Sequence, residues 1–136
     1  MKDEDIARLR YLLPPVLRQF EALIGMDATL ELARHFGGGE LYIPKRVRDK
    51  NKIVQVIGRD HARILAHAFG GERFKDFANA KYALRRFERE LTLARIKRGE
   101  QSLQSAARDL GIQTRRLRHY LNQESQEQRP AQLELF

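Results

Sequence analysis

The sequence predicts a mainly α protein: a helical N-terminal domain with one or two short β-strands, a long connecting helix and a C-terminal helix-turn-helix. Three observations support this fold class. Apolar residues recur at helical spacing in most of the chain, a pattern of helix, glycine pair and strand occurs twice, and residues 103–121 have the spacing of a helix-turn-helix. We expect an N-terminal domain at residues 1–78, a helix and helix-turn-helix domain at 79–122 and a disordered tail at 123–136.

Two prolines separate the first two helices. Residues 4–13 are predicted to form a helix that Pro14 and Pro15 interrupt. A second helix is expected over residues 15–24, because the first turn of a helix accepts a proline such as Pro15.

A segment of the N-terminal half occurs twice. Residues 24–38 and 57–71 lie 33 positions apart and are identical at eight of fifteen positions. Each copy is predicted to contain a helix, with Asp27 as the N-cap in the first copy and Asp60 in the second.

A glycine pair and a short strand follow the helix in each copy. The pairs Gly37-Gly38 and Gly70-Gly71 are expected to end their helices through left-handed caps, and extended runs follow at residues 40–44 and 73–77. Neither pair belongs to a GxxxxGK[ST] or GxGxxG pattern, so we predict no nucleotide site.

Two more helices complete the map before the helix-turn-helix. Residues 46–57 are expected to form one of them, with inward side chains at Val47, Ile53, Val54 and Ile57. Residues 79–97 are expected to form a long amphipathic helix that Gly99 ends. Its predicted inward residues are Tyr82, Leu84, Phe87, Leu91 and Ile96, and its predicted outward residues are Lys81, Arg85, Arg86 and Arg89.

Residues 103–121 carry the strongest functional signal. Ala107 is small where two helices must approach closely, Gly111 suits the positive φ of a tight turn, and Leu117 is placed to pack the second helix on the first. Thr114 is expected to cap the second helix. The candidate DNA-binding residues lie at the start of that helix and are Gln113, Thr114, Arg115, Arg116, Arg118 and His119. The alternative is a surface helical hairpin whose arginines are only solvated.

Positive charge is concentrated near this motif. The chain has a formal net charge of +8 and a pI of about 10.2. Residues 73–119 contain thirteen Lys or Arg and five Asp or Glu, whereas residues 1–72 have a net charge of +2 and residues 120–136 of −2. Binding to phosphates requires clustered positive charge, so double-stranded DNA is the expected partner.

Other function classes find little support in the sequence. The chain has no cysteine, which excludes disulfides and thiolate metal sites and fits a reducing cytoplasm. The charged first residues and the lack of about twenty consecutive apolar residues argue against a signal peptide and a membrane span, so a cytoplasmic location is expected. The four histidines lack metal-ligand spacing and no catalytic cluster surrounds Tyr42, so we expect no metal, no cofactor and no enzymatic activity.

Part of the chain resembles the Mor transcription activator family of Mu-like bacteriophages. The resemblance covers roughly residues 25–121, and it rests on the Phe36-Gly37-Gly38 turn, the Tyr42-Ile43-Pro44-Lys45 strand end and the frame of Ala107, Gly111 and Leu117. It implies a phage or prophage regulator in the bacterial host cell that binds near a promoter, usually as a dimer, and assists host RNA polymerase. It also implies that the strand joins a sheet between subunits and that the helix-turn-helix enters the major groove.

The second copy of the repeat departs from this family pattern. If residues 40–44 pair with residues 73–77 inside one chain, a sheet that is normally built by dimerisation is completed within a monomer. A homodimer predicts a two-fold DNA site with half-sites about one helical turn apart, and a monomer predicts a single short site.

The tail suggests a second partner. Its last five residues resemble the short motif by which bacterial replication and repair proteins bind the sliding clamp, with Gln132, Leu133, Leu135 and Phe136 as the contact residues. The alternative is that the apolar residues pack on the core or on a partner subunit.

We therefore expect a sequence-specific transcription activator that binds promoter DNA through a major-groove helix. Two alternatives stay open. One is a phage adaptor that binds the host sliding clamp through its tail and binds DNA without sequence preference. The other is a nucleoid-type structural DNA-binding protein.

Overall fold

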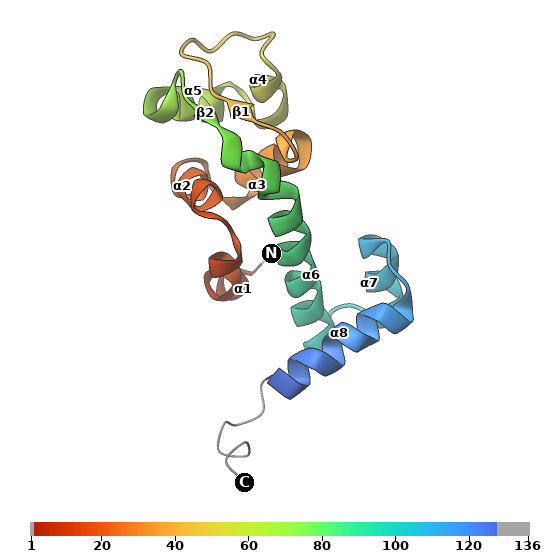
Figure 1. Cartoon of the computed structure of the whole chain (residues 1–136). Helices are drawn as coiled ribbons and strands as arrows, with labels where there is room; N and C mark the ends of the chain where they lie inside the picture. The colour runs from red at the N-terminus through yellow and green to blue at the C-terminus, as the bar shows by residue number, and fades with distance from the viewer. Residues whose placement is uncertain (1, 128–136) are drawn as a thin grey trace. The chain divides into compact units, whose positions relative to one another are not determined.

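A computed structural model describes residues 2–127, except for the side chains of Ala78 and of residues 124–127. It confirms the mainly α fold class (Figure 1). The elements are α1 (Asp3–Leu9), the 3₁₀ helix η1 (Arg10–Leu12), α2 (Pro15–Ile24), α3 (Met26–Phe36), β1 (Leu41–Tyr42), α4 (Lys52–Ile57), α5 (Arg59–Phe69), β2 (Arg73–Phe74), the 3₁₀ helix η2 (Lys75–Asn79), α6 (Ala80–Lys97), α7 (Leu103–Leu110) and α8 (Thr114–Glu127). No helix in this described part of the chain combines the length and the apolar character needed to cross a membrane.

The chain forms two compact units that divide within α6. The N-terminal unit contains residues 2–88, and the C-terminal unit begins at Arg89. This division lies later than the boundary after residue 78 that the sequence suggested. The first half of α6 belongs to the N-terminal unit, where Glu88 bonds to Arg34 on α3, with Arg34 Nη2 2.7 Å from Glu88 Oε1.

The two copies of the repeat have matching backbones. Gly25 and Gly58 both have a φ of 87°, and each donates its N–H to the carbonyl oxygen four residues earlier, on Glu21 at 2.9 Å and on Val54 at 2.8 Å. The repeat therefore extends back into α2 and α4. Each copy is a helix, one glycine, a second helix, a glycine pair and a strand.

The predicted N-caps are wrong. Gly25 and Gly58 occupy the N-cap positions of α3 and α5, and Asp27 and Asp60 lie two residues after them, within the first turns. The sharp turn at each glycine starts the second helix earlier than the aspartates indicate. The two carboxylates still lie at the positive end of a helix dipole, which stabilises them.

The glycine pairs end their helices in another way than predicted. The first glycine of each pair, the cap residue itself, is extended: Gly37 has φ −61° and ψ 146°, and Gly70 has φ −55° and ψ 128°. Only the second glycine of each pair has a positive φ, 97° at Gly38 and 86° at Gly71. The first glycine is required for space, because a Cβ at either position would clash with the carbonyl oxygen four residues earlier.

The two strands form one sheet inside the chain. β1 and β2 are antiparallel, with Leu41 opposite Phe74 and Tyr42 opposite Arg73. Each strand is shorter than predicted, since β2 turns into η2 and buries Phe77 completely. The predicted helix over residues 46–57 is also shorter, because the side chain of Asn51 caps α4 by accepting the Ile53 N–H at 2.8 Å.

Aromatic rings fill the core of the N-terminal unit. Phe20 on α2 lies 5.6 Å from Phe69, 5.2 Å from Phe74 and 6.0 Å from Phe77, measured between ring centroids. Phe69 and Phe74 belong to the second copy and Phe20, on α2, belongs to the first, so these rings join the copies. The Phe20 and Phe74 rings, at an interplanar angle of 83°, pack edge to face, which adds to the stabilisation that burial of the rings provides.

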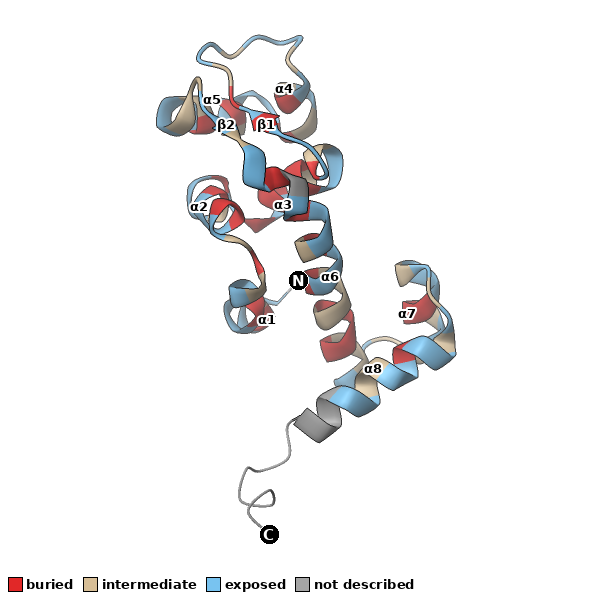
Figure 2. Ribbon diagram, viewed as in Figure 1, coloured by how far each residue is buried: buried red, intermediate tan, exposed pale blue. Residues whose placement is uncertain are grey.

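The second half of α6 packs with α7 and α8 in the C-terminal unit. Leu93, Ala106, Ala107 and Leu117 are its buried centre, and burial falls on the facing sides of these helices (Figure 2).

Two predictions for α6 are wrong. Tyr82, predicted to be inward, is 75% exposed, and Arg89, predicted to be outward, is half-buried.

Candidate nucleic-acid interface

α7 and α8 form the predicted helix-turn-helix. Ser102 caps α7 by accepting the Ser105 N–H at 3.1 Å. Gly111 ends α7 in the left-handed conformation, with φ 68° and ψ 30°, as predicted. Its N–H donates to the carbonyl oxygens of Ala107 and Arg108, and the chain then turns directly into α8.

The predicted packing frame is confirmed by burial. Ala107 is 3% exposed and Leu117 is fully buried, so the small residue and the leucine hold the two helices together. Ile96, Leu103, Leu110, Ile112, Tyr120 and Leu121 pack around them.

Thr114 is the first residue of α8 and not its cap. The first helical hydrogen bond runs from the Leu117 N–H to the Gln113 carbonyl at 3.1 Å, which makes Gln113 the N-cap. The prediction for Thr114 as a cap is therefore wrong by one residue. Gln113, at the N-terminus of α8, is exposed.

The exposed side of α8 gathers most of the predicted DNA-binding residues. Gln113, Arg115, Arg116 and His119 line one hollow of about 450 Å³, and all four are exposed. Arg118 is exposed but does not line this hollow, and Thr114 is half-buried. α8 has no acidic residue in its first turn. The surface is therefore positively charged and rich in hydrogen-bond donors, as an anionic ligand requires.

Tyr120 holds Arg116 in place, a role that was not predicted. The Arg116 Nε donates to the Tyr120 hydroxyl at 3.2 Å, one helical turn along α8. On the same ring, the guanidinium carbon of Arg89 lies 4.2 Å from the centroid, a cation–π contact. The hydrogen bond from Arg116 lowers the pKa of Tyr120, and the positive charges of Arg89 and Arg116 lower it further against the opposing effect of burial. The spacing of Arg116 and Tyr120, four residues apart, is the signal that would have found this pair.

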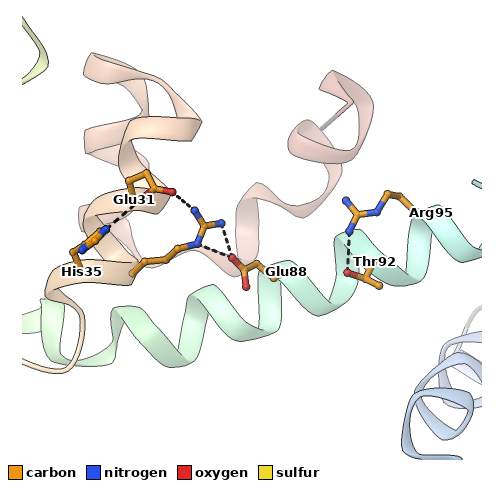
Figure 3. A network of polar contacts seen from close by, with 6 residues as sticks. Glu31, His35, Glu88, Thr92 and Arg95 are labelled. Carbon is orange, nitrogen blue, oxygen red and sulfur yellow. Dashed lines mark hydrogen bonds and ion pairs between the residues drawn. The ribbon is translucent and has the colours of Figure 1, made fainter. Parts of the chain in front are cut away.

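A polar chain joins α6 to α7. Arg95 on α6 donates from Nη2 to Thr92 at 3.1 Å (Figure 3) and from Nε to the side-chain oxygen of Gln101 at 3.1 Å. Gln101 donates in turn to Asp109 on α7 at 2.8 Å. These bonds fix the loop between the helices and so orient the helix-turn-helix on its supporting helix.

The Mor-like strand end belongs to the N-terminal unit. Ile43 is 1% exposed, and Phe36 and Pro44 are half-buried. Tyr42 is 47% exposed, and the guanidinium carbon of Arg73 lies 5.4 Å from the centroid of its ring. The side chain of Ile43 is part of the buried core, while that of Tyr42 is exposed on the sheet.

Other predicted sites give no further centre. The clamp-binding residues Gln132, Leu133, Leu135 and Phe136 lie outside the described residues. Within the described part of the chain, no group of three or more His, Asp or Glu side chains is arranged to hold a metal ion. No protein-family model matches the chain, and no curated protein or solved structure is significantly similar to it.

Proposed function

We propose that this protein is a sequence-specific DNA-binding protein that inserts α8 into the major groove. The observation that carries the proposal is the exposed hollow of Gln113, Arg115, Arg116 and His119 at the start of the second helix of a helix-turn-helix. The N-terminal residues of such a helix meet base edges. Arginine can donate two parallel hydrogen bonds to guanine. Glutamine can also make two hydrogen bonds to adenine, donating one to N7 and accepting one from the N6 amino group.

The fixed position of Arg116 favours sequence-specific binding over binding to phosphates alone. A guanidinium that is held by Tyr120 loses less conformational entropy when it bonds to a base than a free one does. A nucleoid-type protein, which binds every sequence, gains nothing from such an orientation. We therefore place the nucleoid alternative second.

The role in the cell that we propose is activation of transcription with host RNA polymerase in the bacterial cytoplasm. This part of the proposal rests on the Mor-like residues in the sequence, above all the Tyr42-Ile43-Pro44-Lys45 string after a glycine pair. A run-off transcription assay with bacterial RNA polymerase and the selected DNA site tests it. More transcript in the presence of the protein supports activation, and less transcript indicates a repressor.

The test of DNA binding is selection from a random duplex library with the full-length protein at physiological salt. An enriched motif supports the proposal, and Arg116→Ala is expected to weaken the preference at one position of that motif. Retention without enrichment favours the nucleoid alternative. No retention at any salt concentration contradicts the proposed function.

A further inference from the structure

We propose that the N-terminal unit has a second DNA-binding surface, which contacts the phosphodiester backbone of duplex DNA. This surface, the α5 pocket, is a hollow of about 520 Å³ lined by Lys45, Arg46, Val47, Arg63, Ala66 and His67. The inference rests on the proposed function for its choice of ligand, since it extends DNA binding to a unit that contains no part of the helix-turn-helix.

The lining of the α5 pocket is basic. Four of its six residues are Lys, Arg or His, and no carboxylate lines it. Arg63 and His67 are one helical turn apart on α5, and Lys45 and Arg46 follow β1. The stem of Lys45 lies against Gly71, where a Cβ would come within 2.8 Å of its Cε, so the glycine turn helps to hold this lysine at the pocket.

The first copy of the repeat provides an internal comparison. The residues that match Arg63, Ala66 and His67 are Leu30, Ala33 and Arg34, 33 positions earlier. Leu30 is 2% exposed and Ala33 is fully buried. The same helical face is therefore covered in α3.

Arg34, the match of His67, is occupied by ion pairs. It bonds to Glu31 on α3 and to Glu88 on α6 (Figure 3). Two carboxylates thus neutralise the basic group at this position in the first copy. His67 has no such neighbour in the lining of the α5 pocket.

The two copies differ because the chain leaves their strands differently. After β2 it enters η2 and α6, whose Glu88 pairs with Arg34 on α3. After β1 it passes Pro44 into an irregular segment and reaches the next helix only at Lys52. α5 therefore keeps an open face at the place where α6 meets α3. The open face carries Arg63 and His67, both exposed. A helix that packed on this face would require apolar residues at these two positions.

The excess charge of the N-terminal unit falls within the sequence segment that includes Lys45, Arg46 and Arg63 of the pocket. Residues 45–63 contain seven Lys or Arg and two Asp, a net charge of +5, and residues 2–88 as a whole also have a net charge of +5. One of the two carboxylates, Asp49, pairs with Arg59. The rest of the unit is neutral on balance, so a polyanion is attracted to this segment, which supplies three cationic side chains to the α5 pocket.

The shape and lining favour a phosphodiester backbone over other anionic partners. The hollow is open and larger than one phosphate group, and it contains two arginines, whose planar guanidinium groups match phosphate oxygens. Val47 and Ala66 are its only apolar lining residues, which offers little to a lipid surface or to an amphipathic acidic helix.

The experiment measures how the affinity of the full-length protein for its selected duplex depends on salt. The test variant is Arg46→Gln with Arg63→Gln, both exposed, which leaves Lys45 on its glycine turn. The control is Arg18→Gln with Lys75→Gln, which removes the same charge from exposed positions outside the pocket. If both arginines contact phosphates, the slope of log K against log salt becomes about 2 units shallower in the test variant, at roughly 0.9 per phosphate, and changes little in the control.

The outcomes separate this inference from the proposed function. Equal slopes in the test and control variants overturn the α5 pocket as a DNA surface and leave it for an acidic protein partner. A shallower slope in the test variant supports it, even if Arg116→Ala has no effect and the role of α8 fails. If the wild-type protein binds no duplex, both proposals fail. Thermal unfolding of each variant, expected to match the wild type, shows that the fold is kept.

Discussion

Leu41 lies opposite Phe74 in the antiparallel sheet, and Phe74 is the residue that corresponds to Leu41 in the second copy of the repeat, 33 positions later. A residue that faces its own equivalent lies close to a two-fold axis. Two backbone hydrogen bonds follow nearly the same two-fold relation. Gly38 donates its N–H to the carbonyl oxygen of Phe77 at 3.3 Å, and Gly71, its equivalent in the second copy, donates to that of Ile43 at 2.7 Å. One chain thus contains the symmetry that two identical subunits would create.

We expect the protein to be a monomer at micromolar concentration. The sheet is complete within one chain, and strands of two residues offer little free backbone for pairing with a second chain. Sedimentation equilibrium should give a mass near 15.9 kDa. The selected DNA motif should then lack two-fold symmetry, whereas a mass of twice this value and a palindromic site would contradict the prediction.

Tyr120→Phe should weaken DNA binding with little effect on folding. The variant keeps the ring under Arg89 but removes the hydroxyl that accepts from Arg116, a surface bond worth about 1 kcal/mol or less to stability. Binding assays on the single variants and on Tyr120→Phe with Arg116→Ala form a double-mutant cycle. If the hydroxyl acts through Arg116, the tyrosine change has no further effect in the Arg116→Ala background. Additive losses would contradict that role.

Tyr120 should titrate below the ordinary phenol pKa of 10.0, because Arg116 donates to its hydroxyl and Arg89 lies over its ring. A lowered pKa in the folded state means that the fold favours the phenolate. The resulting stabilisation is present above the unfolded pKa of about 10 and is lost as the pH falls through the lower folded pKa. Ultraviolet difference titration of the wild type against Tyr120→Phe isolates this group, and Arg116→Ala should raise its pKa.

Arg116→Ala should reduce specific binding by about 1 to 3 kcal/mol if Arg116 contacts a guanine, and the preference at that base should disappear. If Arg116 contacts a phosphate, affinity falls for all sequences and the salt dependence becomes shallower. Competition binding with single-base variants of the selected site distinguishes these results. Unchanged affinity and salt dependence would exclude Arg116 from the interface.

Gly111→Ala should destabilise the C-terminal unit. Gly111 has a φ of 68°, which costs an alanine roughly 1 to 2 kcal/mol, although a Cβ there meets no neighbouring atom within 4 Å. Denaturant unfolding measures the loss of stability. The control is Ala83→Gly, a substitution at a half-buried position of α6 in the N-terminal unit. A wild-type midpoint for Gly111→Ala would show that the turn does not need a glycine.

The local features of the helix-turn-helix were predictable from sequence. Local backbone geometry requires a glycine at Gly111 and a small residue at Ala107. Their pattern can therefore be recognised in the sequence without knowledge of the rest of the fold. Tyr82 was not predictable in this way. Helical periodicity tells which residues share a face of α6, but it does not tell whether another element covers that face.

The caps and the role of Tyr120 were missed for related reasons. Asp27 is a suitable cap by residue type, but the turn at Gly25 starts α3 one residue before it, and the choice depends on how α2 approaches. Tyr120 faces Arg116, a neighbour on α8, and also Arg89, a residue 31 positions earlier on another helix. The second contact depends on the packing of α6 against α8, which no local pattern encodes.

The internal repeat has a consequence for how surfaces can change. In a homodimer one gene specifies both halves, so every substitution appears twice and a new surface must suit both sides of the axis. Here position 30 is a buried leucine while its counterpart at position 63 is an exposed arginine. Joining the halves in one chain frees each half to mutate independently, so that one can remain structural while the other acquires a task of its own.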